Sequence, residues 1–508
     1  MPFFNIGTDA DGFTIWRMGA ADETSFYLNG GEDFFKGTNA GWLGFLDAGN
    51  GRNEVTLQSN VFTLKLEGGN DVLKILSGTN VESAFMGNGN DRVEMFGGIA
   101  GYVSLGAGRD VLVMRNNSSA LTVGMEDGDD RVTLNNSLIS NLNGFDGDYV
   151  IKLFNGSLIE HTILGGGSND LTLRNSEMHW LQSYGDVTMS MEGNSSVLAI
   201  ELAGGSNVIS TTGPSWIGTL VSHGDLTLDT DSYGVNTLKL WGGSGINNAI
   251  TNGTGDMESI EIWAIQGYHN ISSEGYVRSV SVRDDNAVDM TYGSGGGGSF
   301  HSTSSGTVNI VTTTGVVDQI WLGSGNDSVE IGSAGAGDIG TGSGDDVVIN
   351  HGYTDTLDVA DGNDEIYNYG FIRYVHMWNG ADYYEGSDDQ DVVESGHGND
   401  TVNGNLGDDI IWGRAGADDI RGGGDDDILQ GGNGADEFFF AEGDGSDVIR
   451  DFDVGTDTIV FEGGTIVFGD LAFAEDARGV LVDYGTGEIY LRGVTELEID
   501  DTNNFDFI

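Results

Sequence analysis

Apolar and polar residues alternate along most of the chain, and this pattern predicts β-strands. Runs such as 72–76 and 111–114 alternate in this way after a polar turn, and a period of two is typical of a strand rather than a helix. In the C-terminal third a single apolar residue recurs every nine positions. These residues are Val348, Leu357, Ile366, Val375, Tyr384, Val393, Val402, Ile411, Ile420, Leu429 and Phe438.

Aspartate stands two positions before almost every one of these apolar residues. It fills ten of eleven successive slots, and Arg373 is the one break: Asp346, Asp355, Asp364, Asp382, Asp391, Asp400, Asp409, Asp418, Asp427 and Asp436. Glycine usually stands two positions before the aspartate. The repeating unit is therefore G-x-G-x-D-x-Φ-x, where Φ is apolar, and residues 431–439 show it most clearly.

This unit predicts an all-β fold, a parallel β-solenoid. Glycine-rich turns tolerate positive φ angles, and the residues after each turn suit a short strand with one inward side chain. Two units then make a coil of 18 residues, and stacked coils pair in parallel. Aspartates 18 positions apart would form two columns. One runs from Asp346 to Asp436, and the other holds Asp355, Arg373, Asp391, Asp409 and Asp427.

The first part of the chain predicts the same architecture with longer coils. Turns containing Asp71, Asp91, Asp110 and Asp130 are about 20 residues apart. Asparagines 117, 136, 155 and 175 recur at a similar step, and we expect them to stack and hydrogen-bond at a bend. Apolar residues then hold a strict step of 20: Ile200, Leu220, Leu240, Ile260, Val280, Phe300 and Ile320. Because this phase continues through the Gly-Ser run at 293–299, we interpret that run as a loop on a continuous stack rather than as a linker.

We therefore predict four regions. Residues 1–30 form an N-terminal cap, 31–320 a β-helix with coils of about 20 residues, 321–440 a β-roll with coils of 18 residues, and 441–508 a C-terminal cap. A solenoid needs such caps because its end coils would otherwise expose the core.

Composition excludes several classes of protein. The chain has 80 acidic and 20 basic residues, a formal charge of −60, 85 glycines, 2 prolines and no cysteine. Collagen needs abundant proline, a disulfide scaffold needs cysteine, and a nucleic-acid binder needs a basic surface. No apolar run approaches the ~18 residues of a membrane helix, so we expect no membrane insertion. Disorder fits the charge, but 38% hydrophobic residues in a regular repeat favour a folded core.

The aspartate columns predict a bound cation. Carboxylates ~4.8 Å apart would repel each other by roughly 3 kcal/mol per pair at an effective dielectric of about 20. Oxygen ligands without cysteine and with little histidine favour Ca²⁺ over zinc or copper. A solvated acidic face is the alternative, but it gives no reason for a nine-residue phase.

The repeat resembles the G-G-x-G-x-D-x-U-x signature of the RTX (repeats-in-toxin) proteins, over about residues 320–440. The resemblance implies several Ca²⁺ ions held between consecutive coils by aspartate carboxylates and turn carbonyls. Arg373 departs from the motif, as do Asp389 and Asp425, which replace its second glycine. The implied ligands, with their counterparts in the longer coils, are Gly87, Gly89, Asp91, Gly106, Gly108, Asp110, Gly128, Asp130, Gly323, Gly325, Asp327, Gly342, Gly344, Asp346, Asp355, Gly362, Asp364, Gly380, Asp382, Asp391, Gly396, Gly398, Asp400, Gly407, Asp409, Gly416, Asp418, Asp427, Gly434 and Asp436.

The resemblance also implies a location. The start, Met1-Pro2-Phe3-Phe4, has no basic or apolar leader region, so we expect no ordinary secretory signal peptide. RTX proteins typically leave Gram-negative bacteria unfolded through a type I secretion channel, and residues 504–508 resemble their C-terminal export signal. We therefore expect a secreted protein, extracellular or at the cell surface. Millimolar Ca²⁺ outside the cell suits weak sites, and its binding would drive folding.

Two functions follow as hypotheses. No metalloprotease His-Glu-x-x-His, lipase Gly-x-Ser-x-Gly or phosphate-binding P-loop occurs. The first hypothesis is therefore a non-catalytic, calcium-dependent structural element: a surface layer, matrix, filament or adhesive that self-assembles or meets a cell-surface glycan. The second is a polysaccharide lyase or epimerase, since parallel β-helices often host such enzymes. Its acid–base set would be Lys152, His161, Tyr184, Tyr233 and Lys239.

Overall fold

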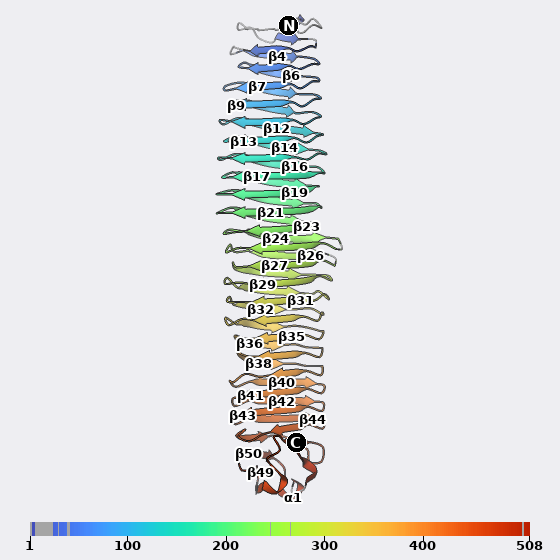
Figure 1. The fold of residues 1–508 in the computed structure, drawn as a ribbon, viewed down its shortest axis with the longest axis vertical. Coiled ribbons are helices and arrows are strands. Elements are labelled where there is room, and N and C mark those ends of the chain that lie inside the picture. Colours follow the sequence, from blue (N-terminus) through green and yellow to red (C-terminus); the bar gives the residue numbers. More distant parts are fainter. Residues whose placement is uncertain are drawn as a thin grey trace. The chain divides into compact units, whose positions relative to one another are not determined.

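The chain folds as the predicted parallel β-solenoid, almost entirely from β-strands (Figure 1). The computed structural model describes residues 3–5, 24–28, 30–37, 41–243, 245–264, 266–499 and 502–508. These fall into two compact units, Met1–Met257 (unit 1) and Glu258–Ile508 (unit 2). The N-terminal cap expected at residues 1–30 lies largely outside the described residues.

Unit 1 consists of two parallel sheets, and each coil contributes one strand to each sheet. The even-numbered strands are β2 (Thr24–Tyr27), β4 (Trp42–Asp47), β6 (Asn60–Lys65), β8 (Asn80–Phe85), β10 (Ile99–Ser104), β12 (Ser119–Glu126), β14 (Leu138–Gly144), β16 (Leu158–Leu164), β18 (Glu177–Ser183), β20 (Ser196–Leu202), β22 (Trp216–Ser222) and β24 (Val235–Gly242), and β1 (Phe3–Asn5) pairs with β2. The odd-numbered strands are β3 (Phe34–Gly37), β5 (Glu54–Leu57), β7 (Val72–Leu76), β9 (Arg92–Phe96), β11 (Val111–Arg115), β13 (Arg131–Asn135), β15 (Val150–Phe154), β17 (Ser168–Arg174), β19 (Asp186–Glu192), β21 (Ser206–Thr212), β23 (Asp225–Thr230) and β25 (Asn247–Asn252).

The register of these strands stacks like residues on like. Leu112 pairs with Val132, and Val132 pairs with Ile151, so one coil spans about 20 residues as predicted. All three side chains are fully buried between the two sheets. At the bends, Asn117, Asn136 and their counterparts have φ of 50° to 60°. Asparagine tolerates this left-handed conformation better than most residues, which is the physical reason for its recurrence there.

Unit 2 continues the two-sheet pattern with shorter coils. Its even-numbered strands are β26 (Ser259–Ala264), β28 (Val277–Val282), β30 (Gly297–Ser302), β32 (Val317–Trp321), β34 (Ala336–Gly340), β36 (Tyr353–Asp358), β38 (Phe371–His376), β40 (Val392–His397), β42 (Ile410–Ala415), β44 (Ile428–Asn433) and β46 (Ser446–Ile449). Its odd-numbered strands are β27 (Tyr268–Ser273), β29 (Ala287–Tyr292), β31 (Val308–Thr312), β33 (Ser328–Ile331), β35 (Val347–Asn350), β37 (Glu365–Asn368), β39 (Tyr383–Glu385), β41 (Thr401–Leu406), β43 (Asp419–Gly424), β45 (Glu437–Phe440) and β47 (Thr458–Phe461).

The eleven apolar residues that follow the aspartate slots all point into this core. Each is at most 1% exposed. In-register pairs run Ile320–Ile339 and then in steps of 18 from Ile339 to Leu429. The Gly-Ser run at 293–299 leads directly into β30, and Gly293 donates its backbone N–H to the Ser273 carbonyl one coil earlier. The run is therefore part of a coil.

The last residues close this stack of coils. Antiparallel strands β48 (Ala472–Asp476), β49 (Gly479–Asp483) and β50 (Glu488–Arg492) attach to β46, and β51 (Phe505–Phe507) pairs with β47. The short helices η1 (Phe468–Asp470), α1 (Glu496–Ile499) and η2 (Thr502–Asn504) lie between them. Phe461 stacks against Phe505 and Phe507, which covers the apolar core. In the described part of the chain, no helix has the length and apolarity to cross a membrane.

Candidate metal centre

The predicted glycines lie in turns that pack directly on one another. The glycine two positions before each aspartate faces the carbonyl oxygen of its counterpart one coil earlier. A Cβ on Gly416 would lie 1.4 Å from the Gly398 oxygen, and one on Gly434 1.4 Å from the Gly416 oxygen. The same packing recurs at Gly344, Gly362, Gly380 and Gly398, and in unit 1 at Gly89, Gly108 and Gly128.

The glycines predicted four positions before the aspartates pack in a similar way. A Cβ on Gly106 would lie 1.6 Å from the Gly87 carbonyl oxygen, and one on Gly342 1.9 Å from that of Gly323. At Gly396 the facing oxygen belongs to Trp378, 2.1 Å away. No side chain fits at these distances, so the turns present backbone carbonyls along the stack.

The predicted aspartates form a hydrogen-bonded ladder. Asp400 donates its backbone N–H to Oδ1 of Asp418 at 3.0 Å, and Asp418 donates in the same way to Asp436. These bonds measure 2.8 to 3.1 Å along the first column, which holds Asp327, Asp346, Asp364, Asp382, Asp400, Asp418, Asp436 and Asp457. The second column holds Asp391, Asp409, Asp427 and Asp447.

Sequence reasoning missed the two aspartates that end these columns. Asp447 and Asp457 follow Asp427 and Asp436 by 20 and 21 residues, so they fall outside the nine-residue step. Their signal was the motif Asp-x-Ile one coil later, because Asp447 and Asp457 precede Ile449 and Ile459 just as Asp418 precedes Ile420.

Asp355 does not belong to the second column, and its prediction as a column member is wrong. It lies on β36, where it accepts a hydrogen bond from the Tyr353 hydroxyl at 2.7 Å. Tyr353 occupies the position that glycine holds in the repeat, so the tight turn does not form there. Above Asp391 the column is continued by Asn368, whose Nδ2 donates to Asp391 Oδ1 at 3.0 Å. Arg373 likewise lies on β38, with its guanidinium 5.2 Å from the Tyr374 ring centre.

Unit 1 contains a second ladder of the same kind. The backbone N–H of Asn53 bonds to Oδ1 of Asp71, and the chain of bonds continues through Asp91 and Asp110 to Asp130 at 2.6 to 2.8 Å. Asp91, Asp110 and Asp130 are predicted site residues, and Asp71 was missed as one.

The second carboxylate oxygen of nearly every ladder aspartate is buried without a hydrogen-bond partner. Asp418 is 0% exposed, and its Oδ2 has no partner among the described residues. Leaving a buried polar atom unsatisfied costs roughly 1–3 kcal/mol, and more when it is charged. The atoms concerned are Oδ2 of Asp71, Asp91, Asp110, Asp130, Asp327, Asp346, Asp364, Asp382, Asp400, Asp409, Asp418, Asp427, Asp436 and Asp447. Asp391 is the exception, because the Ser387 N–H bonds its Oδ2. Each orphaned oxygen therefore needs a proton or a cation.

The residue five positions before the aspartate divides the ladders into two classes. In the last coils it is glycine, and the aspartate Oδ2 faces the space that a side chain would fill. A Cβ on Gly413 would lie 2.5 Å from Oδ2 of Asp418 and 2.6 Å from the carbonyl oxygen of Gly431. Gly404 shows the same convergence, with Oδ2 of Asp409 at 2.0 Å. The other members are the pairs Gly386–Asp391, Gly422–Asp427 and Gly431–Asp436.

In the earlier coils that space is occupied. The residue five positions before the aspartate is a buried side chain, for example Met86 before Asp91 or Leu105 before Asp110. The full set is Leu66, Met86, Leu105, Met125, Leu322, Thr341, Val359, Met377 and, within the nonapeptide region, Ser395. The structure thus gives a cradle for a cation only where glycine leaves it open. Sequence reasoning did not assign these first glycines, although 404, 413, 422 and 431 recur at nine.

Burial raises the pKa of these carboxyl groups. Desolvation is the largest cause throughout, and neighbouring aspartates of the ladder add repulsion. The pKa rises to about 8 at Asp409, to about 7 at Asp418 and to about 7 at Asp427. In unit 1 it rises to about 7 at Asp91 and at Asp130. The ionised ladder is therefore unfavourable without a neutralising partner.

The chemistry of the open cradles fits Ca²⁺. Hard cations of this kind take carboxylate and backbone carbonyl oxygens at about 2.3–2.6 Å, together with water. Among the described residues, no three acidic or histidine side chains gather closely enough to hold a metal by themselves. Asp409, Asp418, Asp427 and Asp436 would each hold an ion with the help of turn carbonyls such as that of Gly431.

The acid–base set considered for a lyase or epimerase is not gathered in one place. Lys152 lies on β15 of the odd-numbered sheet, whereas His161 lies on β16 of the even-numbered sheet, beside the Trp180 ring. Lys239 lies four coils further along, on β24, or roughly 19 Å at the usual strand spacing. Tyr184 and Tyr233 are more than half exposed.

Comparison with known proteins identifies no family. No family model matches the chain, and no curated protein sequence matches it. Among solved structures, the chain is similar to the extracellular lipase LipA from Serratia marcescens, with 15% sequence identity and a TM-score of 0.16. The match covers 41% of this chain and 45% of that one. The chain thus spans less than half of that protein, and a likeness at this level carries no argument about function.

Proposed function

We propose that the chain is a secreted calcium-binding protein with a structural role, and that its C-terminal coils become ordered when they bind Ca²⁺. The observation that carries this proposal is the cradle at Gly413, where a buried, unpartnered carboxylate oxygen and a carbonyl oxygen converge on an open space. The resemblance of the nonapeptide repeat to RTX proteins supports the same ion and export through a type I channel.

Calcium supplies what the ladder lacks. An ion between successive coils neutralises carboxylates whose ionised form is otherwise unfavourable. Sites of this kind have dissociation constants of about 10⁻⁴–10⁻³ M, so they would stay empty in the cytoplasm and fill outside the cell. Binding free energy then becomes folding free energy.

The structural role rests on how the chain is used. Coils make up nearly all of the described residues, and a surface with a formal charge of −60 can be cross-linked by divalent ions. A surface layer, matrix, filament or adhesive uses such a surface. An alternative enzymatic role as a lyase or epimerase has no supporting geometry, since its five candidate residues do not converge.

The calcium claim is tested by titrating the chelator-treated protein with CaCl₂ while far-UV circular dichroism is recorded. We expect β-structure to increase at submillimolar to millimolar Ca²⁺, and isothermal titration calorimetry to report bound ions. In Gly413→Ala, a methyl group fills one cradle, and calorimetry should lose about one ion. Gly469→Ala is the matched control, because a Cβ there meets nothing within 4 Å. Full order in excess chelator with no bound metal would overturn the proposal.

The structural role is tested separately by electron microscopy and sedimentation velocity on the same samples. We expect an ordered assembly, or attachment to cells, at millimolar Ca²⁺. Dispersed single molecules that bind neither cells nor glycans would contradict the structural role, while the calcium result would stand.

A further inference from the structure

The odd-numbered sheet of unit 1 is basic, although the whole chain is strongly acidic. Strands β7 to β17 of this sheet carry six cations and only two acids. The cations are Lys74, Arg92, Arg115, Arg131, Lys152 and Arg174, and the acids are Glu94 and Asp170. We call these six side chains the basic stripe. Because 20 basic residues face 80 acidic ones in the chain, this excess is local.

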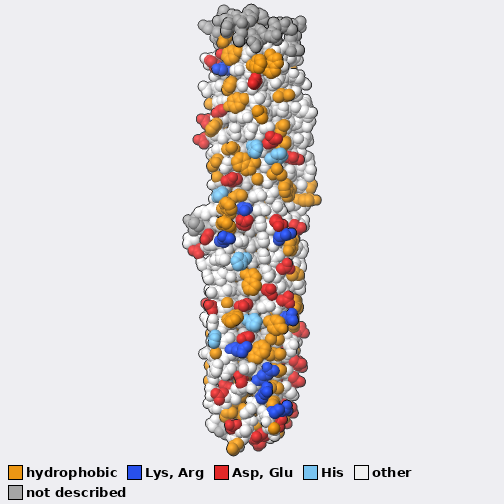
Figure 2. Space-filling model, turned by 180° about the vertical axis from the view of Figure 1, so that it is seen from behind, with side chains coloured by type: hydrophobic (Ala, Val, Ile, Leu, Met, Phe, Trp, Pro, Cys, Tyr) orange, Lys and Arg blue, Asp and Glu red, His pale blue; other side chains and the backbone are white. Residues whose placement is uncertain are grey.

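The neighbouring surfaces have the opposite sign. Even-numbered strands β6 to β18 carry Lys65 as their one cation, against four acids: Glu82, Glu126, Glu160 and Glu177. On the visible face of unit 1, Figure 2 shows few basic side chains among many acidic and hydrophobic ones. In unit 2, odd-numbered strands β27 to β45 carry Arg421 against six acids. The basic stripe is thus a distinct feature of one face.

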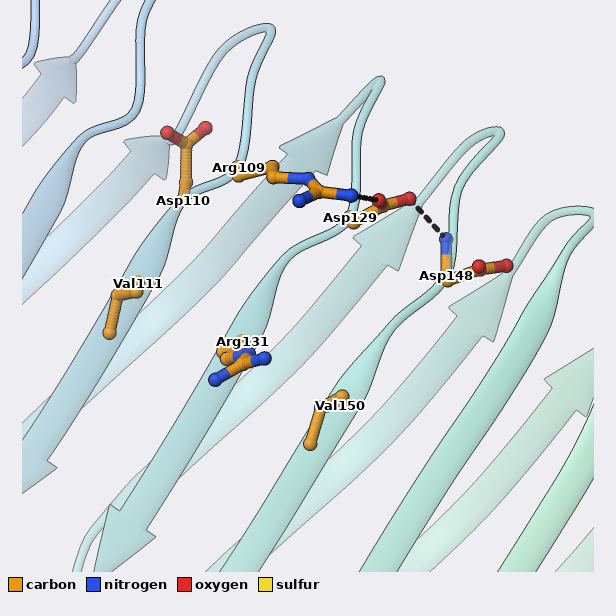
Figure 3. A pocket seen from close by; sticks show the side chains of 7 residues that line it. All are labelled: Arg109, Asp110, Val111, Asp129, Arg131, Asp148 and Val150. Atoms are coloured by element: carbon orange, nitrogen blue, oxygen red, sulfur yellow. Dashed lines mark hydrogen bonds and ion pairs between the residues drawn. The ribbon is translucent and has the colours of Figure 1, made fainter.

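A hollow of about 360 Å³ lies on this stripe at β11, β13 and β15. In Figure 3, Arg131 stands between Val111 and Val150, its in-register neighbours. At the turns, the Arg109 guanidinium bonds the Asp129 carboxylate at 2.6 Å, and Asp129 in turn accepts the backbone N–H of Asp148. The hollow therefore has an apolar floor, a central cation and a polar rim.

Half of the basic stripe is unpaired. Lys74, Arg92 and Arg174 form ion pairs with Glu54, Glu94 and Glu192. Arg115, Arg131 and Lys152 have no ion-pair or hydrogen-bond partner among the described residues, and Arg115 and Arg131 are exposed. The carboxylate nearest the hollow, Asp129, is already neutralised by Arg109, whose hydrogen bond lowers the pKa of Asp129. An incoming anion thus meets free cations.

We propose that this face binds an acidic polysaccharide, with a uronate carboxylate on Arg131. A guanidinium binds a carboxylate through two parallel hydrogen bonds, and Val111 and Val150 would contact the C–H face of the sugar ring. Arg109, Asp129 and Asp148 would bond its hydroxyl groups. Arg115 and Lys152 lie on the neighbouring coils, ~4.8 Å to either side, which suits successive charges of a linear chain.

A linear polymer fits this surface better than a second copy of the protein. A protein partner needs a contact of about 800 Å² on each side, whereas the cations here follow the stack as a narrow line with a single ring-sized hollow. The inference deepens the adhesive form of the proposed function and rests on it only for access to the outside of the cell.

The test is binding of a short oligogalacturonate to the calcium-loaded full chain, measured by calorimetry, with an uncharged galactan oligomer of equal length as the control ligand. Only the acidic oligomer should bind, and its affinity should fall as NaCl is raised. Arg131→Gln removes a charge-assisted pair and should weaken binding by about tenfold or more. Arg278→Gln, an exposed arginine on β28 of unit 2, should leave affinity unchanged.

Three results would overturn the inference. One is equal binding by Arg131→Gln and the parent, and another is no binding by a protein that shows a normal calcium response in circular dichroism. The latter leaves the proposed function intact. The third comes from sedimentation velocity without glycan: if the parent self-associates and Arg131→Gln does not, the basic stripe is an interface between copies.

Discussion

Replacing Asp418 by asparagine separates the electrostatic problem of the ladder from its solution by calcium. The side chain is isosteric, so Oδ1 can still accept the Asp400 N–H. The amide nitrogen then takes the place of Oδ2 and faces the Gly431 carbonyl oxygen across the space above Gly413. A repulsive contact between two oxygens becomes a donor–acceptor contact, and the buried charge disappears.

The magnitude follows from the burial of the carboxyl group. The pKa of Asp418 rises from 3.8 to about 7, chiefly by desolvation. Each unit is worth about 1.4 kcal/mol, so the ionised group destabilises the metal-free fold by up to about 4 kcal/mol above pH 7. A calcium site with a dissociation constant of 10⁻⁴–10⁻³ M returns about 0.4–1.4 kcal/mol at 1 mM Ca²⁺. Asp418→Asn should therefore stabilise the protein in chelator and gain less from calcium.

Hydrogen exchange measured by mass spectrometry gives the local readout. Peptides that span residues 400–436 should exchange more slowly in Asp418→Asn than in the parent at pH 8 in chelator. Addition of 1 mM Ca²⁺ should protect these peptides more strongly in the parent, which narrows the difference. At pH 5 the parent carboxyl is protonated, so the advantage of the variant in chelator should shrink.

Two results would refute this reasoning. If Asp418→Asn destabilised the coils in chelator, the orphaned oxygen would not be the source of the penalty. If calcium protected variant and parent equally, Asp418 would not be a ligand.

Other predictions concern the remaining aspartates. In chelator, folded-state pKa values near 7 at Asp91 and Asp130 lie above their unfolded values. Their stabilising contribution is complete below about pH 4 and is lost as pH rises through 7, so urea denaturation should show unit 1 more stable at pH 5 than at pH 8. Asp110→Asn should raise the melting temperature at pH 8 by the same amount in chelator and in calcium, because Leu105 fills the space beside it; a calcium-dependent difference would contradict the two-class division. Asp355→Asn should leave the calorimetric ion count unchanged, and loss of an ion would restore Asp355 as a ligand.

The fold could be predicted because its constraints are local and repeated. An apolar residue two positions after each turn has only the coil interior to occupy, and Val402, Ile411 and Ile420 are buried as this requires. The step of 20 through Ile320 likewise follows from strands that must stay in register.

The site could be predicted only in part, because a period does not show which atoms meet. The nine-residue step placed Asp355 in a column, yet Tyr353 prevents the turn there. The same step omitted Asp447, which joins the ladder across a coil of 20 residues. The difference between Gly413 and Leu105 depends on where Oδ2 points relative to a Cβ, and that geometry appears only in three dimensions.

The aspartate ladder has a polarity along the chain. Each rung is a backbone N–H that donates to the side chain of the following coil, as Asp409 does to Asp427. Truncating Asp427 would therefore leave the amide of Asp409 unsatisfied, while the amide of Asp427 would keep its acceptor in Asp447. Damage to one coil is passed toward the N-terminus, so the C-terminal coils hold in place those made before them.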